Sequence, residues 1–450
     1  MKIKKMIFPL IVVILSSCHG VTSDQISSSS LPSPSPTKLE NMKTINEYHM
    51  QYDNQTGLPS IGYLSVLVIP IEINDFPFPN NYQETLHTAF NSSKGETGWE
   101  SVSSYYQKSS YGQLNLSFDI IDKYVSPHDR AYFEEYANAG DQMAIIESLY
   151  AIEGIDYSKY DSNDDNFIDS VVFIYSAPSN YEVQPWWGWV YSGDFFYLEN
   201  ELSGDVELGY YMWVSYDFMF QQTLNVEVAL DTTTYIHEVG HLLGLPDYYP
   251  YSGKVGPMGG FDMMDFNVGD HGPFNKMMLG WLDPLYIEAG QAYTLSLESY
   301  ALNNNGDNVA LVIPSPTTNI DDGDLFDEYL LLMYYTPDGL YEQHLGMAAS
   351  IEQAGIVIYH VSARVNYSID TWMMFSFDND GNSHFLLSIL EVDLNSSIPS
   401  PSKTISANDI LLSGRFDCAP YYWHSGDVMD VVININSMSD NEANITVDVY

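Results

Sequence analysis

Hydrophobic and polar positions after about residue 60 alternate between strand and helix patterns. Residues 63–73, YLSVLVIPIEI, are a dense apolar and β-branched run, which is typical of a buried strand. Helical spacing over 101–109 is followed by a turn at Tyr111–Gly112 and a strand over 113–120. A second helix is expected over 139–154, where Gly154 ends it. This order predicts an α/β sheet with helices packed against it.

The pattern changes after Pro284. Residues 292–314 alternate apolar and polar positions around an Asn-Gly turn, and no long helical pattern follows. The last stretch, 430–450, reads as two further alternating strands. We therefore predict an α/β domain over 59–285 and a β-rich, sandwich-like domain over 286–450.

The N-terminus has the pattern of an export signal. Basic residues precede an apolar run from Met6 to Leu15, which is too short for an ordinary membrane-spanning helix. The ending Leu-Ser-Ser-Cys resembles the lipobox of bacterial lipoproteins. That resemblance implies a signal peptide over 1–17 and acylation of Cys18 by a palmitate-type chain. We expect a protein lipid-anchored at the bacterial cell surface, or shed from it; the alternative is a plain signal peptide.

Residues 18–58 are predicted to be a linker, because Ser and Pro dominate its first half and apolar periodicity is absent there. Cys418 is the only other cysteine. If Cys18 is acylated, the mature chain has no intramolecular disulfide, so stability must come from packing and bound ions.

Charge excludes some partners. The 60 acidic and 15 basic residues give a net charge of -45, which argues against nucleic acid, because phosphate binding needs clustered Lys and Arg. Anionic lipid is excluded as a charge-based partner for the same reason, so the membrane is contacted only through the lipid anchor. At 45% hydrophobic and 14% aromatic residues, the chain is expected to fold, and we treat it as a monomer.

An acidic loop precedes the strand pattern near residue 170. Oxygen-bearing groups occupy alternate positions of this loop: Asp161, Asn163, Asp165, the carbonyl of Phe167, and Asp169. Such spacing can bring oxygen ligands together around Ca²⁺. Asn166 stands where glycine is usual, and Val172 stands where an EF-hand has its bidentate glutamate. The loop is a predicted structural calcium site; the alternative is a solvated acidic turn.

The segment 232–244, TTTYIHEVGHLLG, predicts a helix that carries metal-binding side chains. His237 and His241 are one turn apart and share a face, so both imidazoles can bind one Zn²⁺. Glu238 lies beside them and can reach a water molecule. Gly244 permits a turn that returns Asp247 as a third, oxygen ligand. Two histidines and a glutamate in an apolar helix need a reason to be buried, and metal binding supplies one.

In this zinc-motif segment the chain resembles the immune inhibitor A-like zinc metallopeptidases. These are secreted bacterial endopeptidases with a metzincin-like centre. The resembling segments also include 101–120, 160–176, 244–249, 259–284, 328–335 and 354–361. The resemblance implies an α/β metzincin-like zinc-peptidase catalytic domain over 59–285, followed by the β-rich region. The segments around the zinc motif are specific, and the strands after Pro284 are weak signals.

The resemblance implies that His237, His241 and Asp247 bind one catalytic zinc and that Glu238 is the general base. Met264 would be the Met-turn residue beneath the metal. Three other groups could replace Asp247 after folding, namely Asp262, Asp265 and His271. Several metzincins have a tyrosine two residues after the Met-turn methionine, where this chain has a phenylalanine. Tyr248, Tyr249 and His271 are alternatives for that role.

These features predict a zinc-dependent endopeptidase that acts on proteins and peptides. An extended substrate would pair with an edge strand, for which 210–218 is the candidate. Two other classes are compatible with the sequence. One is a catalytically inactive surface adhesin that keeps the fold, and the other is a zinc hydrolase of small amides or esters.

Overall fold

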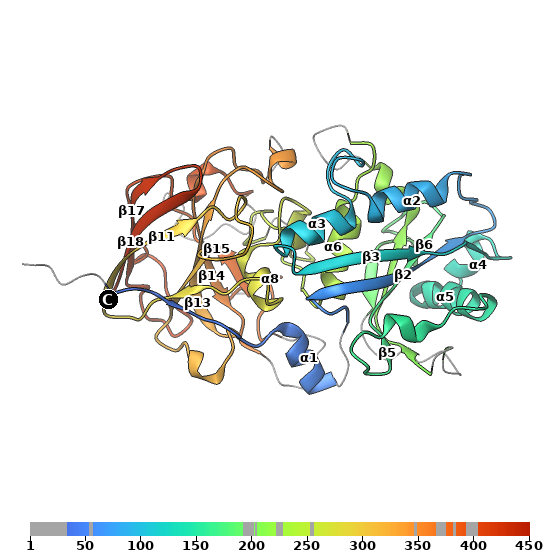
Figure 1. Ribbon diagram of the computed structural model, residues 1–450, viewed down its shortest axis with the longest axis horizontal. Helices are drawn as coiled ribbons and strands as arrows, with labels where there is room; N and C mark the ends of the chain where they lie inside the picture. Colours follow the sequence, from blue (N-terminus) through green and yellow to red (C-terminus); the bar gives the residue numbers. More distant parts are fainter. Residues whose placement is uncertain are drawn as a thin grey trace, which may run out of the picture. The chain divides into compact units, whose positions relative to one another are not determined.

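The computed structural model describes residues 34–53, 57–191, 202, 205–221, 228–252, 256–345, 349–365, 375–380, 384–392 and 404–450 (Figure 1). The predicted signal peptide and Cys18 lie outside these residues. Among the helices of the described part, none combines the length and apolar character that a membrane span requires.

The first sheet has the strand order β3-β2-β6-β9-β7 in the described chain. Its strands are β2 (Gly62–Glu72), β3 (Leu114–Ile120), β6 (Val171–Tyr175), β7 (Trp189–Tyr191) and β9 (Tyr211–Ser215), with β4 (Tyr124–Val125) paired to the end of β2. All pairs are parallel except β7–β9. The segment 210–218 is therefore not an edge, because β9 is paired on both sides. The edge strands of the described sheet are β3 and β7, a correction that depends on the antiparallel pairing of β7 with β9.

Helices cover both faces of this sheet. On one face lie α2 (Tyr82–Asn91), α3 (Val102–Ser109) and α6 (Thr233–Leu242), and on the other lie α4 (Arg130–Glu134) and α5 (Gly140–Ala151) (Figure 1). The side chains of β2 alternate accordingly: Val66 and Val68 join the core under α3 and α6, while Leu67 and Ile69 join the core under α5. The strand and helices predicted over 63–73, 101–109 and 139–154 are thus confirmed.

The second half of the chain forms two further sheets. One has the order β1-β10-β12-β13-β14-β15 and the other β11-β18-β17-β16. Their bounds are β1 (Thr37–Lys38), β10 (Leu285–Tyr286), β11 (Ala292–Glu298), β12 (Ala310–Pro314), β13 (Glu328–Tyr335), β14 (Gly355–Ser362), β15 (Leu387–Ile389), β16 (Arg415–Asp417), β17 (Val431–Met438) and β18 (Glu442–Val449). Leu330 and Leu332 of β13 share one core with Ile433 and Ile445, so the two sheets face each other.

The opposite face of β13 belongs to the core that also contains α6. Leu331 and Met333 belong to the same core as Ile236 and Val239 of α6. Residues 34–450 accordingly form one compact unit. The remaining elements are α1 (Ile45–Asp53), β5 (Phe167–Ile168), β8 (Glu207–Leu208), α7 (Met263–Phe266) and α8 (Pro273–Met278), with β5 and β8 paired in parallel.

The linker predicted over 18–58 extends too far. From Thr37 the described chain is folded: β1 pairs antiparallel with β10, and α1 follows. Ile45 is fully buried and Tyr48 is 4% exposed. The Tyr48 hydroxyl donates to a carboxylate oxygen of Asp324. These apolar positions are stabilised by partners that are remote in sequence, which the local composition does not show.

Candidate metal centre

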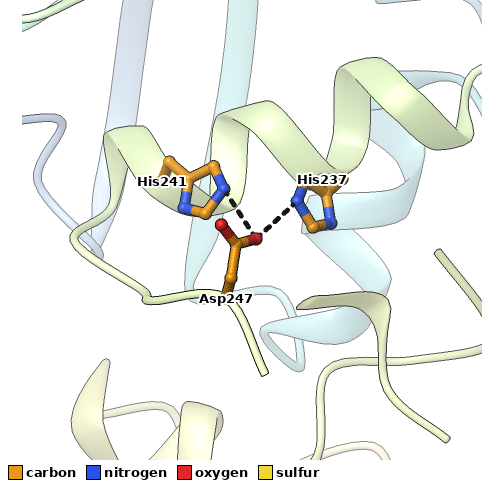
Figure 2. Close-up of side chains that lie close together, drawn as sticks. All are labelled: His237, His241 and Asp247. Atoms are coloured by element: carbon orange, nitrogen blue, oxygen red, sulfur yellow. Dashed lines mark hydrogen bonds and ion pairs between the residues drawn. The ribbon is translucent and has the colours of Figure 1, made fainter. Parts of the chain in front are cut away.

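Three side chains converge at the C-terminal end of α6. His237 and His241 lie one turn apart, and Gly244, with φ +90°, turns the chain so that Asp247 comes back beneath them (Figure 2). One Asp247 oxygen, Oδ1, is 3.0 Å from His237 Nε2 and 3.2 Å from His241 Nε2. Ligand atoms bound tetrahedrally to one zinc are about 3.3 Å apart, given bonds of about 2.0–2.1 Å. The donor set and its spacing therefore fit one zinc ion.

Backbone carbonyls orient both imidazoles. His237 Nδ1 is 2.8 Å from the carbonyl oxygen of Met263, and His241 Nδ1 is 2.8 Å from that of Leu245. A carbonyl oxygen can only accept, so each Nδ1 donates its proton. The two Nε2 atoms are thereby directed toward Asp247, which is the arrangement that a metal-binding histidine pair requires.

The three groups stabilise positive charge between them. Burial acts to raise the pKa of Asp247, but the neighbouring His241 and His237 outweigh it and hold that pKa well below its usual range. For His241, burial acts downward, yet the charge and hydrogen bond of Asp247 raise its pKa to about 9. The Asp247 carboxylate thus stays ionised, and a cation at this point is favoured.

Glu238 is a buried carboxylate beside the histidines. It is 7% exposed, and its Oε2 has no hydrogen-bond partner among the described residues. Gly188 leaves room for it, since a Cβ at Gly188 would lie 3.2 Å from Glu238 Oε1. Burial raises the pKa of Glu238, while the charges of His241 and His237 lower it. A buried carboxylate oxygen without a hydrogen bond is costly, so its place next to the two histidines is consistent with a proton-transfer role.

The turn around α7 forms the floor of the site. Met264 is fully buried, and its Sδ lies against the backbone of Gly240 on α6. The backbone N–H of Tyr248 donates to the Met264 carbonyl at 2.8 Å, which ties the Asp247 segment to this turn. The structure therefore places Met264 against the helix that carries the two histidines; its role as the Met-turn residue stays a prediction.

The three alternatives to Asp247 have other partners. Asp262 accepts from the backbone N–H groups of Met264 and Gly272, both at 2.8 Å. Asp265 accepts from the Gly260 N–H at 2.7 Å. His271 is fully buried with Nε2 3.4 Å from the Tyr106 hydroxyl. Asp247 is the acidic residue that the described structure groups with His237 and His241.

The tyrosines near the site lie in different positions. Tyr248 is fully buried and donates to Asn275 Oδ1, away from the histidines. The ring of Tyr249 stacks on that of His237 with centroids 6.1 Å apart. Tyr251, which the sequence did not single out, donates its hydroxyl to Asp247 Oδ2 at 2.8 Å. In the sequence, only its closeness to Asp247, four residues earlier, could have indicated this contact.

The acidic loop is folded by its own hydrogen bonds. Asp161 accepts from the backbone N–H groups of Asp165 and Asn166, at 3.1 and 3.0 Å. Asn166 adopts φ +70°, as expected of a residue in a glycine position. Asp169 accepts from the Ser162 N–H, and its burial raises its pKa to about 7. The loop oxygens are largely engaged by the loop backbone, so calcium binding remains a prediction.

A scan of the chain against models of known protein families gives no match, and a search of curated proteins finds none either. A function is therefore inferred from the residues and their geometry.

Proposed function

We propose that the protein is a zinc-dependent endopeptidase of the immune inhibitor A-like type. The observation that most directly supports this proposal is the position of Asp247 Oδ1, which lies 3.0 and 3.2 Å from the Nε2 atoms of His237 and His241. Beside them, Glu238 supplies a buried carboxylate oxygen without a hydrogen-bond partner in the described chain. These four groups comprise a three-ligand zinc set and a base.

Zinc held by His237, His241 and Asp247 would activate a water molecule and polarise the scissile carbonyl. Glu238 accepts the proton of the attacking water and then donates it to the departing amine. Burial raises the pKa of Glu238, which strengthens it as a base and makes the return of the proton possible. Tyr251 holds Asp247 through its hydroxyl, and Met264 supports the helix from below.

A peptide substrate is favoured by the position of β7. This strand is one of the two described edges of the first sheet, and Gly188 directly precedes it. Because Gly188 lies against Glu238, a peptide that adds to the sheet along β7 passes the general base. Strand addition recognises the peptide backbone, which supports an endopeptidase over a hydrolase of small amides.

The proposed setting is the bacterial cell surface, with a lipid anchor on Cys18. The proposed calcium in the loop containing Asp161 and Asp169 would have a structural role. Both proposals rest on the sequence patterns.

The test uses the soluble chain from Ser23 onward, with Glu238→Gln as the variant and the exposed Glu153→Gln as the matched control. Bound zinc is measured by mass spectrometry and casein hydrolysis by peptide release. We expect all three proteins to hold the same zinc, and only Glu238→Gln to lose cleavage. Chelation should abolish cleavage in the other two.

Replacing both His237 and His241 with Ala should remove one equivalent of zinc per chain. A folded double variant with unchanged zinc content would refute the metal centre. Zinc binding without any cleavage by the unmodified chain would instead favour the inactive adhesin or a small-substrate hydrolase.

A further inference from the structure

A second group of metal-binding side chains lies on the β-rich half of the chain. Glu328 begins β13, His360 lies near the end of β14, and His424 lies in the connection between β16 and β17. One ligand atom from each lies within 4.8 Å of the others. This group shares no residue and no helix or strand with the histidine pair of α6.

Strand register places Glu328 and His360 on one face. In the antiparallel β13–β14 pair, Leu330 is opposite His360 and Glu328 is opposite Ser362. Opposite residues share a face, as do residues two apart on one strand, so Glu328, His360 and Ser362 point to the same side. Leu330 belongs to the core between the two β-sheets. The group therefore lies at the margin of that core, on the side of β13 opposite to α6.

The distances fit one ion. Glu328 Oε1 is 3.0 Å from His360 Nε2 and 4.0 Å from His424 Nδ1. Atoms that bind one ion through bonds of about 2.0–2.1 Å lie roughly 3–4 Å from each other, depending on the bond angle. The contact with His424 Nδ1 is too long for a hydrogen bond but suits two ligands of a common ion.

The rest of the Glu328 carboxylate is already positioned. Its Oε2 accepts from Arg364 at 3.2 Å, and its Oε1 accepts from the backbone N–H of His424 at 2.7 Å. Oε1 has a second lone pair that can bind an ion. Glu328 is fully buried, so both oxygens are held in place. Hydrogen bonds to a ligating carboxylate are the usual support of a metal site.

A third imidazole lies next to this group. The ring centroids of His384 and His424 are 4.0 Å apart, and the Ser362 hydroxyl is 3.0 Å from His424 Nδ1. Three of the eleven histidines in the chain therefore lie together here, two of them beside the buried Glu328 carboxylate. Two imidazoles with one carboxylate are a ligand set for borderline divalent ions such as Zn²⁺, and they disfavour Ca²⁺ and Mg²⁺.

We propose that Glu328, His360 and His424 form a second zinc site, with His384 beside it. This site would join the sheet containing β13 and β14 to the connection that precedes β17 in the facing sheet. Its role is structural, since the ion would crosslink three chain segments. The alternative is a metal-free ion network in which Arg364, His360 and the His424 backbone N–H contact Glu328, and the Ser362 hydroxyl contacts His424 Nδ1.

The test removes the first site and then the second. In the chain with His237→Ala and His241→Ala, we expect about one equivalent of Zn²⁺ to remain by isothermal titration and mass spectrometry. Adding His424→Ala should abolish that binding, whereas adding the exposed His87→Ala should leave it unchanged. Co²⁺ in place of Zn²⁺ should give visible absorption bands of a low-coordinate site, and these should disappear with His424→Ala.

Folding is checked independently by circular dichroism, and His424→Gln serves as a milder replacement. Zn²⁺ should raise the unfolding temperature of the chain with His237→Ala and His241→Ala, here the first-site variant. It should not raise that of the variant in which His424 is also replaced. If the folded first-site variant binds no Zn²⁺, or if His424 replacement leaves binding unchanged, the second site is excluded and the ion network is correct. Either result leaves the proposed peptidase centre untouched.

Discussion

The sulfur of Met264 lies directly against the backbone of Gly240: a Cβ at Gly240 would be 2.4 Å from Met264 Sδ. Gly240 is on α6 between Glu238 and His241, and both Gly240 and Met264 are buried. The helix that carries the histidines can therefore approach its methionine floor only because a side chain is absent at this position.

Gly240→Ala should destabilise the protein although alanine is the better helix former. Replacing glycine with alanine inside a helix stabilises it by about 1 kcal/mol, but overpacking of a buried contact costs about 1–3 kcal/mol. Either Met264 or α6 must move, so the zinc content should also fall. Thermal unfolding and zinc analysis measure the two effects. Met264→Ala in the same chain should restore the α6 position; a Gly240→Ala variant that is more stable than the unmodified chain contradicts the contact.

Tyr251→Phe should weaken zinc binding with little loss of stability. The Tyr251 hydroxyl donates to Asp247 Oδ2, while Oδ1 is the oxygen near both histidines, so removal of the hydroxyl frees the carboxylate to rotate. Loss of such a supporting hydrogen bond typically reduces metal affinity about 10–100-fold. Competition with a chelator gives the affinity, and Tyr63→Phe is the control, because Tyr63 is 90% exposed. Equal affinities in both variants would show that Tyr251 does not hold Asp247.

The local periodicity of apolar residues was sufficient to predict α6, which carries the two histidines, and two elements of the domain around it. The strand over 63–73, the helix over 101–109 and the helix around His237 appear as β2, α3 and α6. Each has a regular spacing of apolar residues within one segment, and that spacing is what a sequence pattern records. Asp247 could be predicted as the third ligand because Gly244, three residues earlier, indicates a turn.

Contacts between remote segments were not predictable in the same way. Gly188 precedes an edge strand whose partner is β9, and no local signal links it to Glu238. The folded part of the predicted linker depends on partners such as Asp324. Glu328, His360 and His424 are joined by the register of β13 and β14 and by a loop, so their sequence spacing matches no metal motif.

Lys276→Met should cost about 3–5 kcal/mol of stability, because it leaves Asp270 buried without its cation. Lys276 is fully buried with Nζ 2.6 Å from Asp270 Oδ2, and it lies over the rings of Tyr111 and Tyr300, each 4.3 Å away. Urea unfolding measures the loss, with the exposed Lys159→Met as control. Replacing Asp270 with Asn as well should recover part of it. A single variant as stable as the control would mean that the pair contributes nothing.

His344 should make the protein less stable as the pH falls below about 6.5. The side chain is fully buried, the Gly269 N–H is 3.3 Å from its Nδ1, and its ring contacts that of Trp99 with centroids 4.8 Å apart. Burial lowers the pKa of His344 from 6.5 to about 4. Between these pH values the unfolded chain binds a proton at this residue that the folded chain does not bind. The stability contribution is therefore complete above pH 6.5 and is lost as the pH falls toward 4.

The difference of 2.5 between 6.5 and about 4 corresponds to about 3 kcal/mol, at 1.36 kcal/mol for each pH unit. His344→Asn keeps an acceptor for the Gly269 N–H but cannot be protonated in this range. Urea unfolding of both proteins at several pH values between 4 and 7 gives two stability curves. The curve of the unmodified chain should fall more steeply toward low pH, by up to that amount. If the two curves stay parallel, His344 binds its proton equally in the folded and unfolded chains, and its burial does not control the acid sensitivity of the fold.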